Sequence, residues 1–283
     1  MTTAADPARD WIAREIRSRV IGPDPTASSV AIMREPGPRW FDEGAPIRQV
    51  HGDAAMFAGG LRAILLQSLH PLAMAGVAQH SDYRNDPWGR LQRTAEFLAA
   101  TTYGPIPMAE RAVARVLAVH RHVVGEATDG RAYSANDPHL LRWVHVAEVD
   151  SFLCAHRRFG EHALDRAQAD AYVRDTAVVA RKLGVNEPPC SVAELRTELR
   201  EYRSELQGTP EAREAAHFLL IEPPLPFAAR APYGLLAAAA VSLLPAWARW
   251  PLRLPYLPVS ERLLVRPAGS ALTQIIRWSL SPR

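Results

Sequence analysis

Lysine is almost missing from this chain of 283 residues, in which Lys182 is the only lysine among 33 basic residues. Schiff-base catalysis needs a lysine amine, and Lys182 lies in the polar sequence ARKLGV, so this class of enzyme is not expected. The arginines are spread along the chain, the formal net charge is only +3, and no basic stripe or binding motif accompanies them. We therefore expect no nucleic-acid partner.

Cysteine and long apolar segments are also scarce. Cys154 and Cys190 form neither a CxxC pair nor a zinc pattern, which is typical of reduced thiols in a cytoplasmic protein. The first residues carry acids and no apolar core, so a secretory signal is not expected. The apolar run Pro232–Trp250 is shorter than the roughly 20 residues of a membrane span and contains Pro245. We interpret it as a buried helix and a turn, while the adjacent RWPLR leaves peripheral contact with a membrane open.

Alternating strand patterns, internal repeats and glycine-rich phosphate loops are absent as well. Helical periodicity runs nearly throughout and predicts an all-α protein with a single domain over residues 1–283. Within it, residues 1–44 are expected to form an N-terminal helix and a linker, and residues 45–283 a helical core. The expected helices are 7–22, 45–68, 71–80, 88–103, 107–124, 137–162, 166–183, 191–206, 210–221, 232–243 and 258–279.

Two histidines lie two positions apart in the sequence RVLAVHRHVVG. Successive helix positions differ by about 100°, so His120 and His122 point in different directions. His120 falls on an apolar stripe with Val113 and Leu117, whereas His122 falls among arginines. A histidine on such a stripe is either a hydrogen-bonded core residue or a neutral imidazole suited to bind heme iron.

Other polar residues also fall at interior or turn positions. His145 shares an apolar face of the next helix, whereas His139 and His156 lie near its ends and are expected to be solvated or to cap it. His70 precedes a proline and is expected at a turn between two helices.

Arg90 and Thr94 are four positions apart and share a helix face with Phe97. The pair is compatible with a surface ion-pair site, with a partner for a heme propionate, or with a group that polarises bound oxygen.

Three ordered segments carry a family resemblance: LLQSLHPLAMAGVAQHSDYRNDPWGRLQRT, VHRHVVG and GRAYSANDPHLLRWVHVAEVDSFL. They resemble the MpaB/rubber-oxygenase (latex clearing protein) catalytic-domain family, clearly over Gly59–Phe159 and loosely as far as Arg249. The resemblance implies a globin-like helical core around a b-type heme, which is an iron cofactor. It further implies a heme-dependent oxygenase, whose partners are O₂ and a small or medium apolar organic substrate.

The family motifs transfer to individual positions of this chain. The histidine of the family's H-x-x-V-x-G element is His120, which the resemblance makes the proximal iron ligand. The arginine and threonine of RLQRT are Arg90 and Thr94, which it places near the heme as catalytic candidates. His145 of WVH and His70 of LHP are the further cofactor-binding candidates.

Two positions depart from the family pattern, and two other functions stay open. The lysine before the threonine is replaced by Arg93, and the upstream catalytic carboxylate by Met74, so cleavage of polyisoprene is not expected. A carrier or sensor of heme without catalysis would share every pocket residue. A di-iron helical bundle needs two Glu-x-x-His motifs, and only Glu214-x-x-His217 is present.

Overall fold

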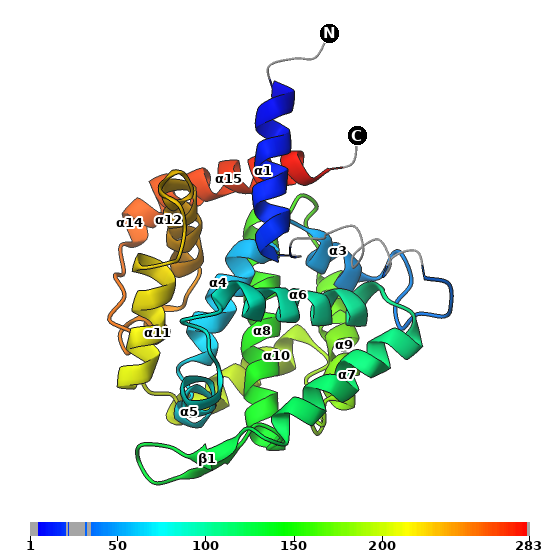
Figure 1. Ribbon diagram of the computed structural model, residues 1–283, viewed down its shortest axis with the longest axis vertical. Coiled ribbons are helices and arrows are strands. Elements are labelled where there is room, and N and C mark those ends of the chain that lie inside the picture. The colour runs from blue at the N-terminus through cyan, green and yellow to red at the C-terminus, as the bar shows by residue number, and fades with distance from the viewer. Residues whose placement is uncertain (1–4, 21, 23–31, 33–34, 282–283) are drawn as a thin grey trace.

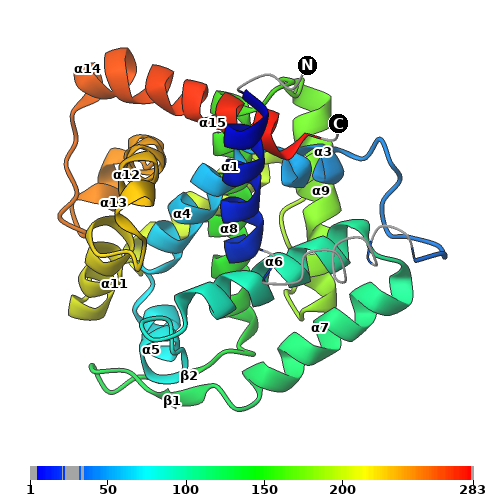
Figure 2. The same cartoon turned by 45° about the horizontal axis from the view of Figure 1, so that its top comes forward.

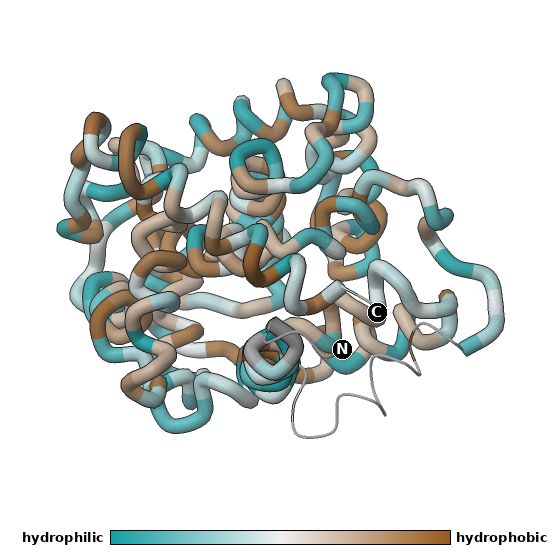
Figure 3. The backbone as a smooth tube through the Cα atoms, turned by 90° about the horizontal axis from the view of Figure 1, so that it is seen from above, coloured by the Kyte–Doolittle hydropathy of each residue, from teal (hydrophilic) through white to brown (hydrophobic). Residues whose placement is uncertain are grey.

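The computed structural model describes residues 5–20, 22, 32 and 35–281. Its regular structure is helical apart from one small sheet, which confirms the predicted all-α class (Figure 1). The linker predicted within residues 1–44 lies largely outside the described residues. Along the helices, hydrophobic and hydrophilic stretches alternate, as Figure 3 shows from above. This alternation lets each helix bury one face.

The core is built around helix α8, Pro138–Phe159, which runs through the molecule and packs extensively on α4, Met56–Gln67. Gly59 makes this close packing possible, because a Cβ atom at this position would lie 2.9 Å from Cδ1 of Phe152. Helix α8 begins as predicted at Asp137, whose side chain accepts a hydrogen bond from the backbone of His139, and it ends before Gly160.

Two helices cover a second side of α8. Helix α9, Arg166–Lys182, begins with a capping box, and α10, Val192–Glu201, begins at Ser191, which was predicted as a helix start. The last turn expected in the 191–206 helix is instead the 3₁₀ turn η1, Tyr202–Ser204.

Helices α5, Pro71–His80, α6, Pro87–Tyr103, and α7, Ile106–His120, follow α4 in the chain, and α6 and α7 form a helical hairpin. His70 precedes α5 at the turn expected there. The helix predicted over 107–124 ends at His120, because the chain then enters a hairpin of β1, Val124–Glu126, and β2, Ala132–Ser134. Strands of three residues are too short to show an alternating pattern.

The single helix predicted over 45–68 is wrong, because α3, Pro46–Gly52, and α4 are separate. Asp53 causes the break: its Oδ1 accepts a hydrogen bond from the backbone nitrogen of Ala55 at 2.7 Å. The same carboxylate accepts two-pronged hydrogen bonds from Arg277 near the C-terminus. A residue with these partners cannot continue the helix.

The C-terminal segments lie beside α4 and α8, and the first helix crosses the last one (Figure 2). The helix predicted over 232–243 begins five residues earlier and contains Pro232, and the one predicted over 258–279 contains a π-helical turn. The first helix is α1, Ala5–Val20. The C-terminal segments are α11, Pro210–Ile221, α12, Phe227–Ser242, α13, Ala246–Arg249, α14, Pro258–Ser260, η2, Glu261–Val265, and α15, Arg266–Leu280.

Among the described residues, no single helix has the length and hydropathy of a membrane span; only α4 and α5 together, bent by 106°, meet those criteria. Much of α4 is buried against α8, as expected of a core helix.

Candidate functional site

His120 is the last residue of α7 and lies on its inner face, whereas His122 is exposed in the following turn. Burial lowers the pKa of His120, so the imidazole is neutral at pH 7. Its Nδ1 atom is buried and has no hydrogen-bond partner among the described residues, and no described residue bonds its Nε2 atom either. The placement agrees with the helical periodicity, while the role of iron ligand stays a prediction.

Arg90 is a half-buried cation without a carboxylate partner in the described part of the chain. Its Nη1 donates a hydrogen bond to the hydroxyl of Ser81 at 2.5 Å, and burial lowers its pKa. A guanidinium in such surroundings favours an anion or a polarised oxygen. Thr94, one turn further on, is exposed, and its hydroxyl donates to the backbone oxygen of Arg90.

His145 and Glu148 lie one turn apart on α8 and share its inner face. Burial lowers the pKa of His145 to about 4 and raises the pKa of Glu148 to about 7. The Nε2 atom of His145 is buried without a partner, and Glu148 makes no hydrogen bond or ion pair with a described residue. Both side chains nevertheless keep some accessible surface. They are therefore half-buried, and solvent or a ligand can reach them.

His51 on α3 connects this face of α8 to helices α6 and α9. Its Nδ1 lies 2.9 Å from the hydroxyl oxygen of Thr102, and its Nε2 lies 3.4 Å from that of Tyr172. Its ring also meets Phe152 edge-on, with the centroids 5.5 Å apart. Burial lowers the pKa of His51 to about 3. Burial, assisted by the nearby carboxyl of Glu148, raises the pKa of Tyr172.

Sequence analysis missed three of these residues. Glu148 was visible in the pattern His145-x-x-Glu148, which places both side chains on one face, but the unusual pKa depends on neighbours from other helices. His51 and Tyr172 carry no local signal, because they meet only through tertiary packing.

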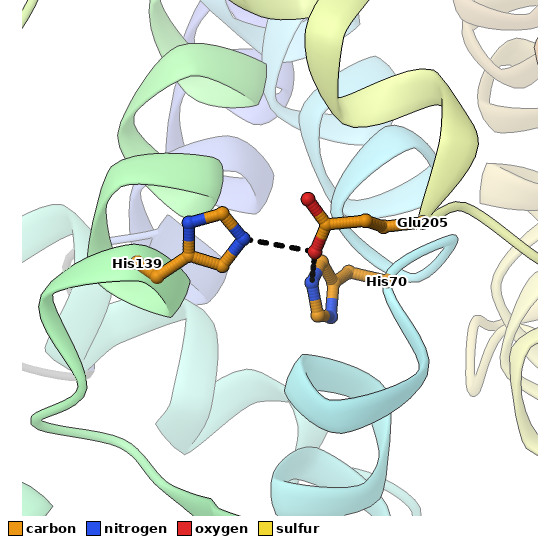
Figure 4. Close-up of side chains that lie close together, drawn as sticks. All are labelled: His70, His139 and Glu205. Atoms are coloured by element: carbon orange, nitrogen blue, oxygen red, sulfur yellow. Dashed lines mark hydrogen bonds and ion pairs between the residues drawn. The ribbon is translucent and has the colours of Figure 1, made fainter.

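His70 belongs to a different group of side chains. Its Nε2 lies 3.4 Å from Oε2 of Glu205, and the same oxygen lies 2.8 Å from Nε2 of His139. Figure 4 shows the three side chains converging from separate segments. No contact with Arg90 or His120 is found for His70, and its predicted role in holding the cofactor gains no support from this placement.

Two other expectations can be examined directly. His156 was expected to be solvated or to cap the helix, but it is 2% exposed because it lies on the buried face of α8; its two ring nitrogens have no partners in the described structure.

Glu214 and His217 are exposed; Glu214 pairs with Arg84 and His217 with Glu222. The Glu-x-x-His motif that the sequence offers for a di-iron site is therefore engaged in surface ion pairs.

A cavity of about 540 Å³ opens on the opposite face of α8 from His145 and Glu148. Several arginines line it, among them Arg157, Arg196 and Arg266. None of the candidate residues on α6 and α7 lines this cavity. Its large volume therefore does not make it the candidate site.

Comparison with known proteins gives one match. Residues 48–278 match the model of the family described as ER-bound oxygenase mpaB/B′/rubber oxygenase, catalytic domain. No curated protein and no solved structure matches the chain. The match includes every candidate residue named from the sequence.

Proposed function

Because the chain belongs to the mpaB/rubber oxygenase catalytic-domain family, we propose that it is a heme b-dependent oxygenase of small or medium apolar organic substrates. The family supports an oxygenase, and the observation that supports heme is the unpartnered imidazole of His120. Bound heme would supply the iron at which O₂ is activated. The globin-like arrangement around the heme belongs to the same proposal.

The donor set around His120 fits a heme. An imidazole that binds iron must be neutral, and burial favours the neutral form of His120. No described residue competes for its ring nitrogens. Val113 and Leu117 precede it on the same inner face of α7 and provide apolar surface beside the ring. His120 would therefore bind the metal, with His145 as a further polar group of the pocket.

Arg90 supplies the positive charge that a heme site needs. Its half-buried guanidinium has only a hydroxyl partner in the described structure, so a propionate or a polarised oxygen would replace part of the solvation that it lacks. Arg90 would orient O₂ in the site. The hydroxyl of Thr94 donates to the backbone oxygen of Arg90 and would help to hold that residue in place.

Glu148 would hold and transfer a proton. A carboxyl whose pKa is about 7 is both a donor and an acceptor near neutral pH. The neutral His145, one turn away, adds no positive charge that would lower this pKa. Neither Met74, which is buried in the core, nor Arg93, which pairs with Asp86 on the surface, provides such a group.

The apolar surface of α7 favours an apolar substrate, and both cleavage of a C=C bond and monooxygenation are compatible with these residues. A panel of terpenes and lipids, incubated with reduced protein and O₂, separates the two by product masses. Oxygenated products would also separate an enzyme from a carrier or sensor, which predicts none.

The spectrum of the purified protein tests the heme. We expect a Soret band when cells are supplied with a heme precursor, and retention of less than a tenth of the heme in His120→Ala. His122→Ala is the matched control, because this histidine is exposed two residues later. A colourless protein, or greater heme loss in His122→Ala, would overturn the proposal.

A further inference from the structure

Three potential metal ligands converge from segments that are far apart in the chain. His70 lies at the turn between α4 and α5, His139 in the first turn of α8, and Glu205 directly after η1 (Figure 4). One nitrogen from each histidine and one carboxylate oxygen all lie within 4.8 Å of one another. Two imidazoles and a carboxylate form a donor set that catalytic zinc sites use.

The distances are close to those of a coordinated ion. With metal–ligand bonds of about 2.0 Å, adjacent ligands of a tetrahedral ion lie about 3.3 Å apart. Here Oε2 of Glu205 lies 3.4 Å from Nε2 of His70 and 2.8 Å from Nε2 of His139. Adjustments of the partly exposed His139 and Glu205 side chains are sufficient to place an ion between them.

His70 is the observation that points to a ligand. The residue is 1% exposed, and neither ring nitrogen has a hydrogen-bond partner in the described structure. The 3.4 Å approach to Glu205 is an ion pair only if the ring is protonated. A buried polar ring without a partner is costly. A cation bound at Nε2 would satisfy that nitrogen.

The surrounding side chains hold the ligands in place. Tyr202 donates a hydrogen bond to the backbone oxygen of His139 at 2.9 Å, and its hydroxyl lies 3.3 Å from Nδ1 of the same residue. An Nδ1–H that donates to this hydroxyl leaves Nε2 of His139 free to coordinate. The indole ring of Trp143 lies beside His70, and its nitrogen donates to the backbone of Gln67.

We propose that His70, His139 and Glu205 bind one divalent transition-metal cation of the zinc class. The mixed nitrogen and oxygen donors suit zinc, and the partial exposure of His139 and Glu205 leaves water access to a fourth position. The ion ties the α4–α5 turn to α8 and to the segment after η1. This site uses no residue that the proposed iron or proton chemistry requires, so each proposal can fail without the other.

Zinc titration of the full-length protein tests the site. Protein in its purified, heme-loaded form is treated with a chelator, dialysed against Zn²⁺ and analysed for zinc and iron by elemental analysis. We expect one zinc per chain, and zinc affinity weaker by about 100-fold or more in His139→Ala and Glu205→Gln. These positions are chosen because both side chains are partly exposed and their replacement leaves the core intact.

His217→Ala is the matched control, because His217 is an exposed histidine 3.8 Å from a glutamate oxygen. Its zinc affinity should equal that of the unchanged protein. Tyr202→Phe should weaken zinc binding by about 10-fold or more, which is typical of an orienting partner. Zinc X-ray absorption should report two imidazoles. Absence of stoichiometric zinc, or a zinc affinity in His139→Ala and Glu205→Gln equal to that of the unchanged protein, would refute the site.

Discussion

Charged side chains on two sides of the molecule differ in whether they have a partner of opposite charge. Figure 2 shows α4, α12, α13 and α15 on one side of the molecule. There Arg249 donates to Glu261, and Arg62 on α4 donates to Asp150 on α8. On the side formed by α6, α7 and the inner face of α8, Arg90 and Glu148 have no partner of opposite charge among the described residues. Arg249 and Arg62 are almost fully buried, whereas Arg90 and Glu148 are half-buried and remain accessible to another molecule.

The paired groups stabilise the fold, whereas the unpaired groups are candidates for binding a ligand. A buried pair satisfies itself, and its loss is expected to reduce stability. An unpartnered buried group costs stability and is retained when another molecule needs it. Removing one group at a time from each side tests this division.

Arg249→Met should have the largest effect on stability. Arg249 is 2% exposed, donates to Glu261 at 2.5 Å and also to two backbone oxygens. Its removal leaves a buried carboxylate unpaired, which is expected to cost about 3–5 kcal/mol of unfolding free energy. Urea unfolding measures this loss. Arg131→Met, in the exposed pair with Asp129, should lose far less stability.

Glu148→Gln should lower turnover by about 100-fold, because it removes a proton donor and acceptor. The pH–rate profile of the unchanged protein should show an ionisation near pH 7 that is missing from the variant. Glu110→Gln, at an exposed position, is the control. An unchanged profile in Glu148→Gln would remove Glu148 from the proton chemistry.

The same group predicts a pH-dependent stability. The pKa of Glu148 is raised by burial from 4.5 to about 7, so the folded protein binds this proton more tightly than the unfolded chain. Its contribution is fully present below about pH 4.5 and is lost as the pH rises through 7, by on the order of 3 kcal/mol. Glu148→Gln should therefore be the more stable protein at pH 8, but not at pH 4.5, in urea unfolding.

Arg90→Met should affect the stability of the protein differently from Arg249→Met. Because its guanidinium has no carboxylate partner in the described structure, heme-free protein should keep or gain stability when the charge is removed. Because Arg90 is assigned the orientation of O₂, turnover should fall by about tenfold, which is a larger fractional loss than that of bound heme. A stability loss comparable to that of Arg249→Met would contradict the division between the two sides.

Thr94→Val should have the smallest effect. The threonine is exposed, and its hydroxyl donates only to the backbone oxygen of Arg90. Turnover within about threefold of the unchanged protein is expected, since the backbone hydrogen bonds of the helix also hold that backbone in place without the hydroxyl. A tenfold loss would show that the hydroxyl contacts substrate or cofactor and would place Thr94 with the unpartnered groups.

Local rules predicted the features that depend on a few neighbouring residues. The helix starts at Asp137 and Ser191 follow from capping side chains that bond to backbone groups two or three residues away. The inward position of His120 and the outward position of His122 follow from rotation about the helix axis. The same rules placed His70 at a turn before a proline.

Those rules failed where distant segments compete with the helix. At the break in the predicted 45–68 helix, the Asp53 carboxylate accepts from the backbone of Ala55 and also from Arg277, more than 200 residues later. His156 was expected in water near the end of α8, and the structure buries it, because burial there depends on the helices packed around α8.

The sequence by itself determined that this protein is helical, where most helices begin, and which histidine of the 120/122 pair faces inward. Only the tertiary structure decided that Glu205 meets His70 and His139, that Arg249 has a partner and Arg90 has no carboxylate among the described residues, and that the pKa of Glu148 lies near 7. Helix periodicity and capping act over three or four residues along the chain. Desolvation and charge pairing act through space, between atoms that packing brings together.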